Sequence, residues 1–305
     1  MHTSDTVPAN HQKGLLLTGL GGLLISFDIP LIRLAEGDPW AIVAVRSTLM
    51  TAAGFAGWYL IGFLTGRRPP IVPGWAGVWV TLFYSLCSLT FMLAIYMTPT
   101  ANLAFILALN TVWTALLSWI FLKERPATST IIAIVLMLGG LLFIVRDGMS
   151  GGHYLGDLVA MLASFCLSCA ITISRKVKKD FGLAPLFAGF PAAVLGFIMV
   201  GAGFGAGSIV IDDPLFLVLN GFIVVPIAFW FLATGPKYIS APEVAMFYLL
   251  ETILAPVWVW WIYAEEPGVN TLIGGSIMIA ALIGHSLWQL ARERRLARER
   301  RAQAA

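Results

Sequence analysis

Two stretches of this 305-residue chain decide its fold, and they repeat one another. Residues 101–145 read ANLAFILALNTVWTALLSWIFLKERPATSTIIAIVLMLGGLLFIV, and residues 242–286 read PEVAMFYLLETILAPVWVWWIYAEEPGVNTLIGGSIMIAALIGHS. They align without a gap at an offset of 141 positions. The coinciding residues include Glu124 with Glu265, Pro126 with Pro267, Trp119 with Trp260 and Thr111 with Thr252. Because a charged Glu-x-Pro break recurs at the same place, each copy is predicted to form two membrane helices joined by a short polar turn.

The composition of the whole chain predicts a polytopic membrane protein. Hydrophobic residues make up 59% of it, charged residues only 11%, and the mean hydropathy is +0.86. A soluble domain cannot bury so much apolar surface. The first apolar run is too long for a cleavable signal and is expected to stay in the membrane. Cys87, Cys166 and Cys169 all lie in apolar runs, so we expect them to pack, with no metal and no cofactor bound.

Ten runs are long enough to cross the ~30 Å hydrocarbon core, which takes about 20 apolar residues. They are 15–34, 39–64, 75–97, 101–122, 128–145, 155–174, 184–204, 214–233, 241–263 and 269–290. The breaks between them are too short for a separate soluble domain. The predicted organisation is a short N-terminus (1–13), one five-helix repeat (14–146), a second (153–290) and a basic tail (291–305).

The charges predict the orientation of these spans. With the N-terminus in the cytoplasm, the inside segments and the tail carry most of the Lys and Arg residues, and the outside turns carry mainly acids such as Glu36, Asp38 and Glu266. The positive-inside rule therefore favours an N-in/C-in protein. The arginine-rich tail is expected to lie near anionic lipid headgroups of the bilayer, and no nucleic acid partner is expected.

An odd number of helices in each repeat means that the second repeat enters the membrane from the opposite side. The fold is therefore predicted to be an all-α polytopic membrane protein with ten transmembrane helices in two inverted five-helix repeats. This architecture is typical of secondary transporters, which bind substrate near the midplane between the repeats.

Several segments together resemble a known family. They are AVRSTLMTAAG (44–54), GDLVAMLASF (156–165), KYISAPEVAMFYLLETILAP (237–256) and AEEPGVNTLIGGSIMIAALIG (264–284). The pattern is similar to the EamA family of the drug/metabolite transporter superfamily, over roughly residues 14–288. The resemblance implies ten helices in two halves and export of small metabolites, and the family includes exporters of aromatic amino acids. One departure is that Glu251 is followed by Thr252 where the family often has proline; Pro256 lies about a turn further on.

Asn110 and Glu251 occupy the same position in the two copies. Each lies nine or ten residues from the start of its predicted span, which is about 14–15 Å at 1.5 Å per residue and so near the midplane. An acid at that depth costs about 2.5–3.5 kcal/mol and should face protein or water. Glu251 is either a group that binds the substrate's amino group or carries a proton, or a structural acid hydrogen-bonded to a neighbouring helix. For Asn110, an interhelical hydrogen bond is favoured over contact with the ligand.

Asp28 and Arg46 lie at nearly equal depth on adjacent predicted helices, so we expect an ion pair. It is either a fixed structural lock or a gate that breaks during transport. Pro30, close to Asp28, removes a backbone hydrogen bond and is a candidate hinge, as are Pro226 and Pro256 in two later spans.

The predicted cavity between the third, fourth, eighth and ninth helices is aromatic and weakly polar. Its candidate substrate-binding residues, besides Glu251 and Asn110, are Tyr84, Ser88, Asn102, Trp113, Phe247 and Tyr248. Without a midplane Lys or Arg, such a cavity suits zwitterionic or cationic molecules with apolar side chains and not phosphorylated ones.

The sequence thus predicts an alternating-access exporter of amino acids or related small metabolites in the cell (inner) membrane. An exporter of hydrophobic cationic drugs is the alternative, because Asp28 and Glu251 among aromatic rings would serve cations as well. An enzyme is not expected, since no nucleophile–base arrangement or metal-binding motif is present. Coupling to protons is an open alternative at Glu251, and a monomer is the simplest assembly.

Overall fold

The structure, a computed structural model, describes residues 6–66, 68, 70–123, 126–177, 183–234, 238–239 and 241–304. In these residues it is helical, apart from turns and one isolated bridge between Gly37 and Ile211. The first half contains α1 (Thr6–Ile25), α2 (Asp28–Leu34), α3 (Pro39–Thr65), α4 (Gly74–Met97), α5 (Thr100–Ala108), α6 (Asn110–Leu122) and α7 (Thr128–Ser150). The second contains α8 (Tyr154–Val177), α9 (Ala184–Phe187), α10 (Gly189–Gly201), α11 (Pro214–Val218), the π-helix η1 (Leu219–Val224), α12 (Val225–Thr234), α13 (Ala241–Tyr263) and α14 (Val269–Ala304).

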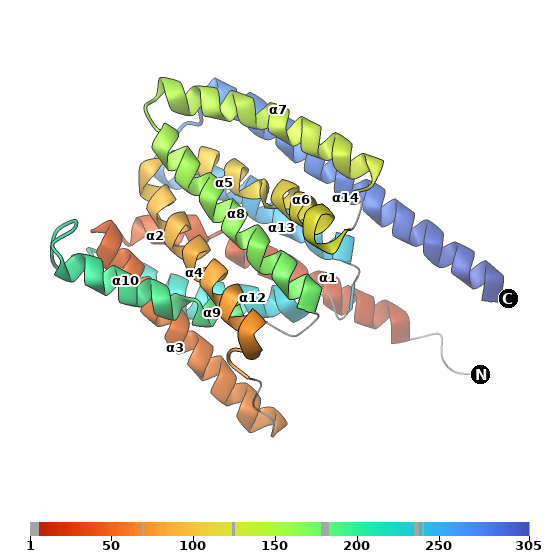
Figure 1. The fold of residues 1–305 in the computed structure, drawn as a ribbon, viewed down its shortest axis with the longest axis horizontal. Coiled ribbons are helices and arrows are strands. Elements are labelled where there is room, and N and C mark those ends of the chain that lie inside the picture. The colour runs from red at the N-terminus through yellow and green to blue at the C-terminus, as the bar shows by residue number, and fades with distance from the viewer. Residues whose placement is uncertain are drawn as a thin grey trace.

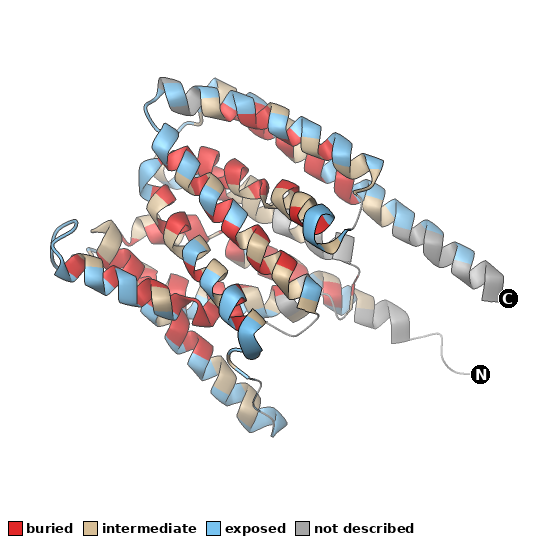
Figure 2. Ribbon diagram, in the orientation of Figure 1, coloured by how far each residue is buried: buried red, intermediate tan, exposed pale blue. Residues whose placement is uncertain are grey.

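Nine helical stretches among the described residues are long and apolar enough to cross a membrane. α13 adds a shorter apolar segment, Leu250–Tyr263. Large apolar side chains such as Leu142, Trp230 and Trp261 are exposed on the outside of the bundle, where a bilayer would cover them. Figure 2 shows buried and exposed positions alternating along most helices, as expected for helices that face protein on one side and lipid on the other.

The helices pair in a pattern that is unchanged when the two halves are exchanged. α4 packs on α8 as α12 packs on α1, and α6 packs on α8 as α13 packs on α1. The pairs α3–α10, α5–α13 and α7–α14 each join equivalent helices of the two halves, and Figure 1 shows α7 and α14 side by side along one edge of the bundle. The predicted two-repeat organisation is therefore present as a symmetric set of helix contacts.

Two glycine contacts show the same symmetry at single residues. Gly14 in α1 packs so closely against the segment before α13 that a Cβ there would lie 2.6 Å from the Cβ of Tyr238. Gly156 in α8 touches the backbone of Met97, before α5, and has no room for a Cβ either. Gly14 and Gly156 are 142 positions apart, and Met97 and Tyr238 are 141 apart. The contact of one repeat is thus reproduced in the other.

Four of the predicted continuous spans are interrupted. The first breaks between α1 and α2 at Ser26 and Phe27, the fourth at Leu109, and the seventh at Ala188. The eighth widens into the π-helix η1, and Pro226 follows as the second residue of α12. α13 continues through Pro256, the third candidate hinge, as one helix.

The contact between α7 and α14 depends on glycine at one position and not at its neighbour. A Cβ on Gly140 would lie 2.6 Å from the Gly274 carbonyl oxygen, whereas a Cβ on Gly139 would meet nothing within 4 Å. We therefore expect Gly140→Ala to destabilise the protein by about 1–3 kcal/mol, because the helices must separate. Gly139→Ala should be neutral or stabilising by up to about 1 kcal/mol, because alanine is the better helix former. Thermal unfolding of the purified protein in detergent measures both, and equal shifts would contradict the assigned helix contact.

Candidate functional site

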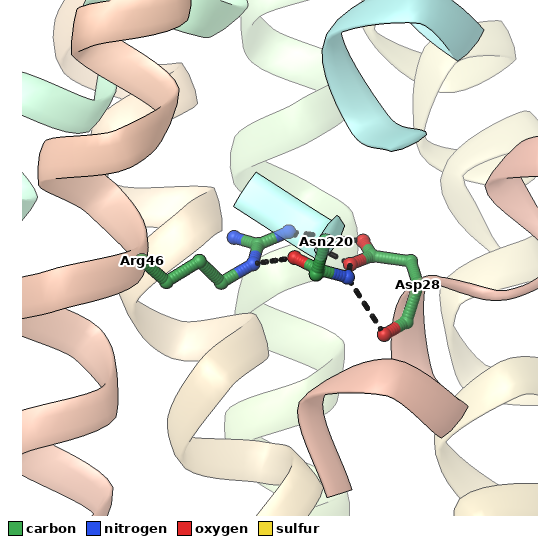
Figure 3. Close-up of polar contacts among 3 residues, drawn as sticks. All are labelled: Asp28, Arg46 and Asn220. Carbon is green, nitrogen blue, oxygen red and sulfur yellow. Dashed lines mark hydrogen bonds and ion pairs between the residues drawn. The ribbon is translucent and has the colours of Figure 1, made fainter. Parts of the chain in front are cut away.

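The restarted helix α2, the continuous helix α3 and the π-helix η1 bring Asp28, Arg46 and Asn220 together. Asp28 is the first residue of α2, Arg46 lies in α3, and Asn220 lies in η1 of the other repeat. Arg46 Nη2 donates to Asp28 Oδ1 at 2.8 Å and to Oδ2 at 3.1 Å, and Arg46 Nε donates to Asn220 Oδ1 at 2.7 Å. Asn220 Nδ2 donates to Asp28 Oδ1 at 2.7 Å and to the Asp28 carbonyl oxygen at 3.0 Å (Figure 3). We call this group the central triad.

The central triad is almost fully enclosed by protein. Asp28 is 6% exposed, Arg46 2% and Asn220 0%. Burying two charges is costly, and the cost is offset only where the charges are paired and their remaining bonds are made. Asn220 supplies those bonds with both ends of its amide, so it connects the two repeats through a neutral group.

The backbone around the triad is shaped to allow these bonds. α1 ends at Ile25, and the Ser26 hydroxyl caps the Leu23 carbonyl at 2.6 Å, so α2 restarts with Asp28 turned inward. η1 widens the helix at Asn220, as π-turns often do at functional sites. A Cβ on Gly221 would lie 3.0 Å from the Arg46 carbonyl oxygen, so glycine permits the close approach of η1 to α3.

Glu251 lies in α13 beside this network. Its side chain is half-buried, and α13 packs against α2, the helix that begins with Asp28. Among the described residues Glu251 has no hydrogen bond or ion pair. It is thus an acid without a counterion next to a charge pair that is already balanced.

Asn110 is the first residue of α6, directly after the break at Leu109. Its Oδ1 accepts a hydrogen bond from the Thr111 hydroxyl at 3.2 Å. Its carbonyl oxygen accepts one from the Ser168 hydroxyl at 2.9 Å, which ties the break to α8 of the second repeat. The interhelical bond expected at Asn110 is therefore made by its backbone, while its half-buried side chain bonds within α6.

The other predicted site residues divide between the centre and the helix packing. The Trp113 ring packs edge-on against Phe165 with centroids 5.5 Å apart. Its indole nitrogen and the Ser88 hydroxyl are buried without a hydrogen-bond partner in the described part of the chain. Tyr84 packs beside the buried Val80–Ala170–Ala184 cluster. Phe247 faces α1, where its ring contacts Gly19, and the side chain of Tyr248 lies outside the described part.

Asn102 lies far from the others, at the end of the bundle that carries the α13–α14 turn. Its Oδ1 accepts a hydrogen bond from the Thr271 hydroxyl at 2.7 Å, so it links α5 to α14. Asn102 also lines a pocket of about 640 Å³ together with Arg33, Tyr96 and Glu265. We call this end of the bundle the distal face, since the start of α1 and the end of α14 lie at the opposite end (Figure 1).

A second ion pair joins the repeats at the distal face. Arg33 Nη1, near the end of α2, bonds to Glu265 Oε2 in the α13–α14 turn. Glu265 Oε1 also accepts from the Thr100 backbone N–H at 2.9 Å, and Arg33 Nη2 donates to the Ile95 carbonyl oxygen at 3.3 Å. We call the Arg33–Glu265 pair the distal latch, since it connects the ends of α2, α4 and α5 to the α13–α14 turn.

Sequence reasoning missed the roles of Asn220, Arg33 and Glu265. An Asn-Gly dipeptide inside an apolar span was the available signal for Asn220. Arg33 lies at the predicted end of the first span and Glu265 in the turn between the last two spans, so nothing in the sequence marks them as partners. The guanidinium of Arg46 also bonds to Asn220 of the eighth span, so one wall of the predicted cavity does carry an arginine.

The described residues contain no group of three or more His, Cys, Asp and Glu side chains that could hold a metal ion.

Comparison with known proteins gives one family and a set of similar folds. The EamA-like transporter family matches residues 12–146 and 154–287, which covers both repeats. A solved structure described only as "Crystal structure of protein" is similar over 91% of this chain and 98% of its own, with a TM-score of 0.63 and 19% identity. At that identity the likeness shows the fold alone. A search of the curated proteins gives no match.

The central triad makes a sharp prediction about stability. Arg46→Ala leaves Asp28 buried without its counterion, and we expect a loss of about 3–5 kcal/mol in the free energy of unfolding. Asp28→Ala should cost a similar amount, and the double variant no more than either single one, because it leaves no lone charge. Asn220→Ala should cost about 1–3 kcal/mol.

Denaturation of the purified variants in detergent gives these differences, with Arg295→Ala in the exposed tail as a control that should not move the transition. Additive losses in the double variant would contradict the coupling within the triad.

Proposed function

Because this chain belongs to the EamA-like transporter family, whose members move small molecules across membranes, we propose that it exports amino acids, with aromatic and apolar ones favoured, by alternating access. The protein would cross the cell (inner) membrane ten times, with α13 as the ninth span. The start of α1 and the end of α14 lie at the same end of the bundle, which requires an even number of crossings (Figure 1). The basic segments at that end favour the cytoplasmic side for both termini.

The observation that carries the proposal is the uncompensated acid at the centre. Glu251 is half-buried in α13, next to a triad that already neutralises itself, and Trp113 and Ser88 each hold a donor without a partner in the described residues. An acid in the membrane interior needs a cation or a proton. The ammonium group of an amino acid supplies the cation.

Alternating access is supported by the charges at the two ends of the bundle. At the distal face Arg33 and Glu265 join the two repeats. At the offsets of 142 and 141 that relate the repeats, these residues correspond in sequence to Arg175 and Glu124. Each repeat thus supplies one arginine and one glutamate at equivalent positions. An inverted-repeat carrier needs such a pair at each face, because each face must close in turn.

Export of hydrophobic cations is the second candidate, and the same acid favours it. A cationic drug would use Glu251 and the aromatic rings and would need no partner for a carboxylate. The two candidates therefore differ in whether removal of the substrate's carboxylate abolishes or preserves transport.

Transport by the purified protein in liposomes tests the choice. We expect labelled phenylalanine and other apolar amino acids to be carried, and phenylalaninamide and cationic dyes to be carried poorly. Glu251→Gln should lower amino-acid transport at least tenfold, because a charge-assisted contact is worth about 1.5–3 kcal/mol. Glu299→Gln, a carboxyl loss in the exposed tail, is the matched control. Transport of dyes but not of amino acids would replace the first candidate by the second.

The same variant separates proton coupling from simple exchange. If Glu251 carries the proton, Glu251→Gln should abolish transport driven by a pH gradient and retain counterflow exchange of labelled for unlabelled substrate. If transport driven by a pH gradient survives in Glu251→Gln, this residue is not the proton carrier.

A further inference from the structure

The distal pocket is built differently from the central site. Its volume of about 640 Å³ lies within the roughly 300–1,000 Å³ typical of small-molecule sites. It is lined from both repeats, with Arg33 from α2 and Glu265 and Glu266 from the α13–α14 turn. Neither the central triad nor Glu251 lines it. The pocket is therefore separate from the site assigned to transport.

Both members of the distal latch line this pocket and are reachable from it. The side chain of Arg33 is 22% exposed and that of Glu265 is 28% exposed. An ion pair that solvent can reach is screened and is held more weakly than one enclosed by protein. A ligand that offers equivalent charges can therefore replace the latch at little cost.

The geometry selects the class of ligand. A cation alone could bind Glu265 but would leave Arg33 without its counterion, and an anion alone would do the reverse. A zwitterion with adjacent carboxylate and ammonium groups replaces both halves at once, with the carboxylate on the guanidinium of Arg33. The exposed carboxylate of Glu266 adds a second acceptor for the ammonium group, and Tyr96 offers an aromatic surface for an apolar side chain.

A polar donor in the wall of the pocket supports a ligand site. Asn102 is 2% exposed and lines the pocket. Its Oδ1 is used by Thr271, while its Nδ2 has no hydrogen-bond partner among the described residues. This amide is therefore available to an acceptor such as a carboxylate oxygen within the pocket.

We propose that the distal pocket is a second binding site for a zwitterionic α-amino acid, which binds by exchanging the Arg33–Glu265 ion pair for its own carboxylate and ammonium groups. Because the latch holds α2 against the α13–α14 turn, the bound amino acid releases that connection and favours opening of the distal face. A ligand shifts an equilibrium in this way only by its greater affinity for the opened state. The class of ligand rests on the proposed function, whereas the site itself does not use Glu251.

Binding stoichiometry tests the proposal. Equilibrium dialysis of labelled phenylalanine against the purified full-length protein should give two bound molecules per chain. Arg33→Gln and Glu265→Gln should each bind one, and so should Glu251→Gln, which keeps the distal site and loses the central one. His153→Gln, at an exposed position in the pocket wall, is the matched control and should bind two.

A charge exchange excludes misfolding as the cause. The double variant Arg33→Glu with Glu265→Arg should regain the second molecule, because a zwitterion can bind in the reversed orientation. Phenylalaninamide and N-acetylphenylalanine should compete at the distal site at least tenfold more weakly than phenylalanine. Hydrogen exchange of the Thr100 amide should speed up when phenylalanine binds, since Glu265 then leaves it.

The results distinguish the two proposals. One phenylalanine per chain that is lost in Glu251→Gln and kept in Arg33→Gln overturns the distal site and leaves the transport proposal standing. Loss of one molecule in Arg33→Gln with no change in Glu251→Gln supports the distal site and removes Glu251 from substrate binding. Equal competition by the amide or the N-acetyl compound overturns the exchange of both charges.

Discussion

A charge pair enclosed at membrane depth persists only where protein groups replace the water that both charges have lost, and the bonds among Asp28, Arg46 and Asn220 meet that condition. The irregular backbone follows from it. α1 stops before Asp28, and the carbonyl oxygen of Asp28 accepts a hydrogen bond from the Asn220 side chain. The π-turn and Gly221 then allow η1 to approach α3. Such departures from helix are tolerated in a membrane because they are buried in protein.

Hydropathy and internal repetition predict most of the fold. The apolar runs locate nine spanning stretches and α13, because a helix must cross a fixed apolar thickness. The repeat predicts the exchangeable helix pairing, which Gly14 and Gly156 show at the level of single residues. Pro30 and Pro191 follow the interruptions at Ser26 and Ala188 by four and three residues, and each lacks the backbone N–H that would continue the helix. The interruption at Leu109 is not predicted, because no proline or charge marks that position.

The sequence predicts those site residues that are recognised by their depth in the membrane alone. Counting residues from the span ends singles out Asp28, Arg46 and Glu251. Asn220 lies six residues from the start of its predicted span, at the depth of Asp28, but its bonds to Asp28 and Arg46 are not predicted, since the π-turn sets the direction of its side chain without a local sequence rule. Arg33 and Glu265 are 232 positions apart, and their contact depends on how the two repeats close on each other.

The two polar clusters differ in what surrounds them, and this sets their uses. The central triad is closed to solvent, and its bonds join α2, α3 and η1. The distal latch is open on one side and weakly held, so it suits a contact that is made and broken. The short helix α2 thus carries one enclosed ion pair and one that solvent can reach.

The glycine contact between α7 and α14 has a mechanical consequence. Gly140 and Gly274 bring backbone against backbone, with no side chain between them that could adopt another rotamer. Sliding one helix along the other would press a carbonyl oxygen into a neighbouring residue's Cβ, so the pair resists shear. These two helices, one from each repeat, therefore form a rigid pair at the edge of the bundle. Any rotation of the remaining helices against one another takes this pair as its fixed axis.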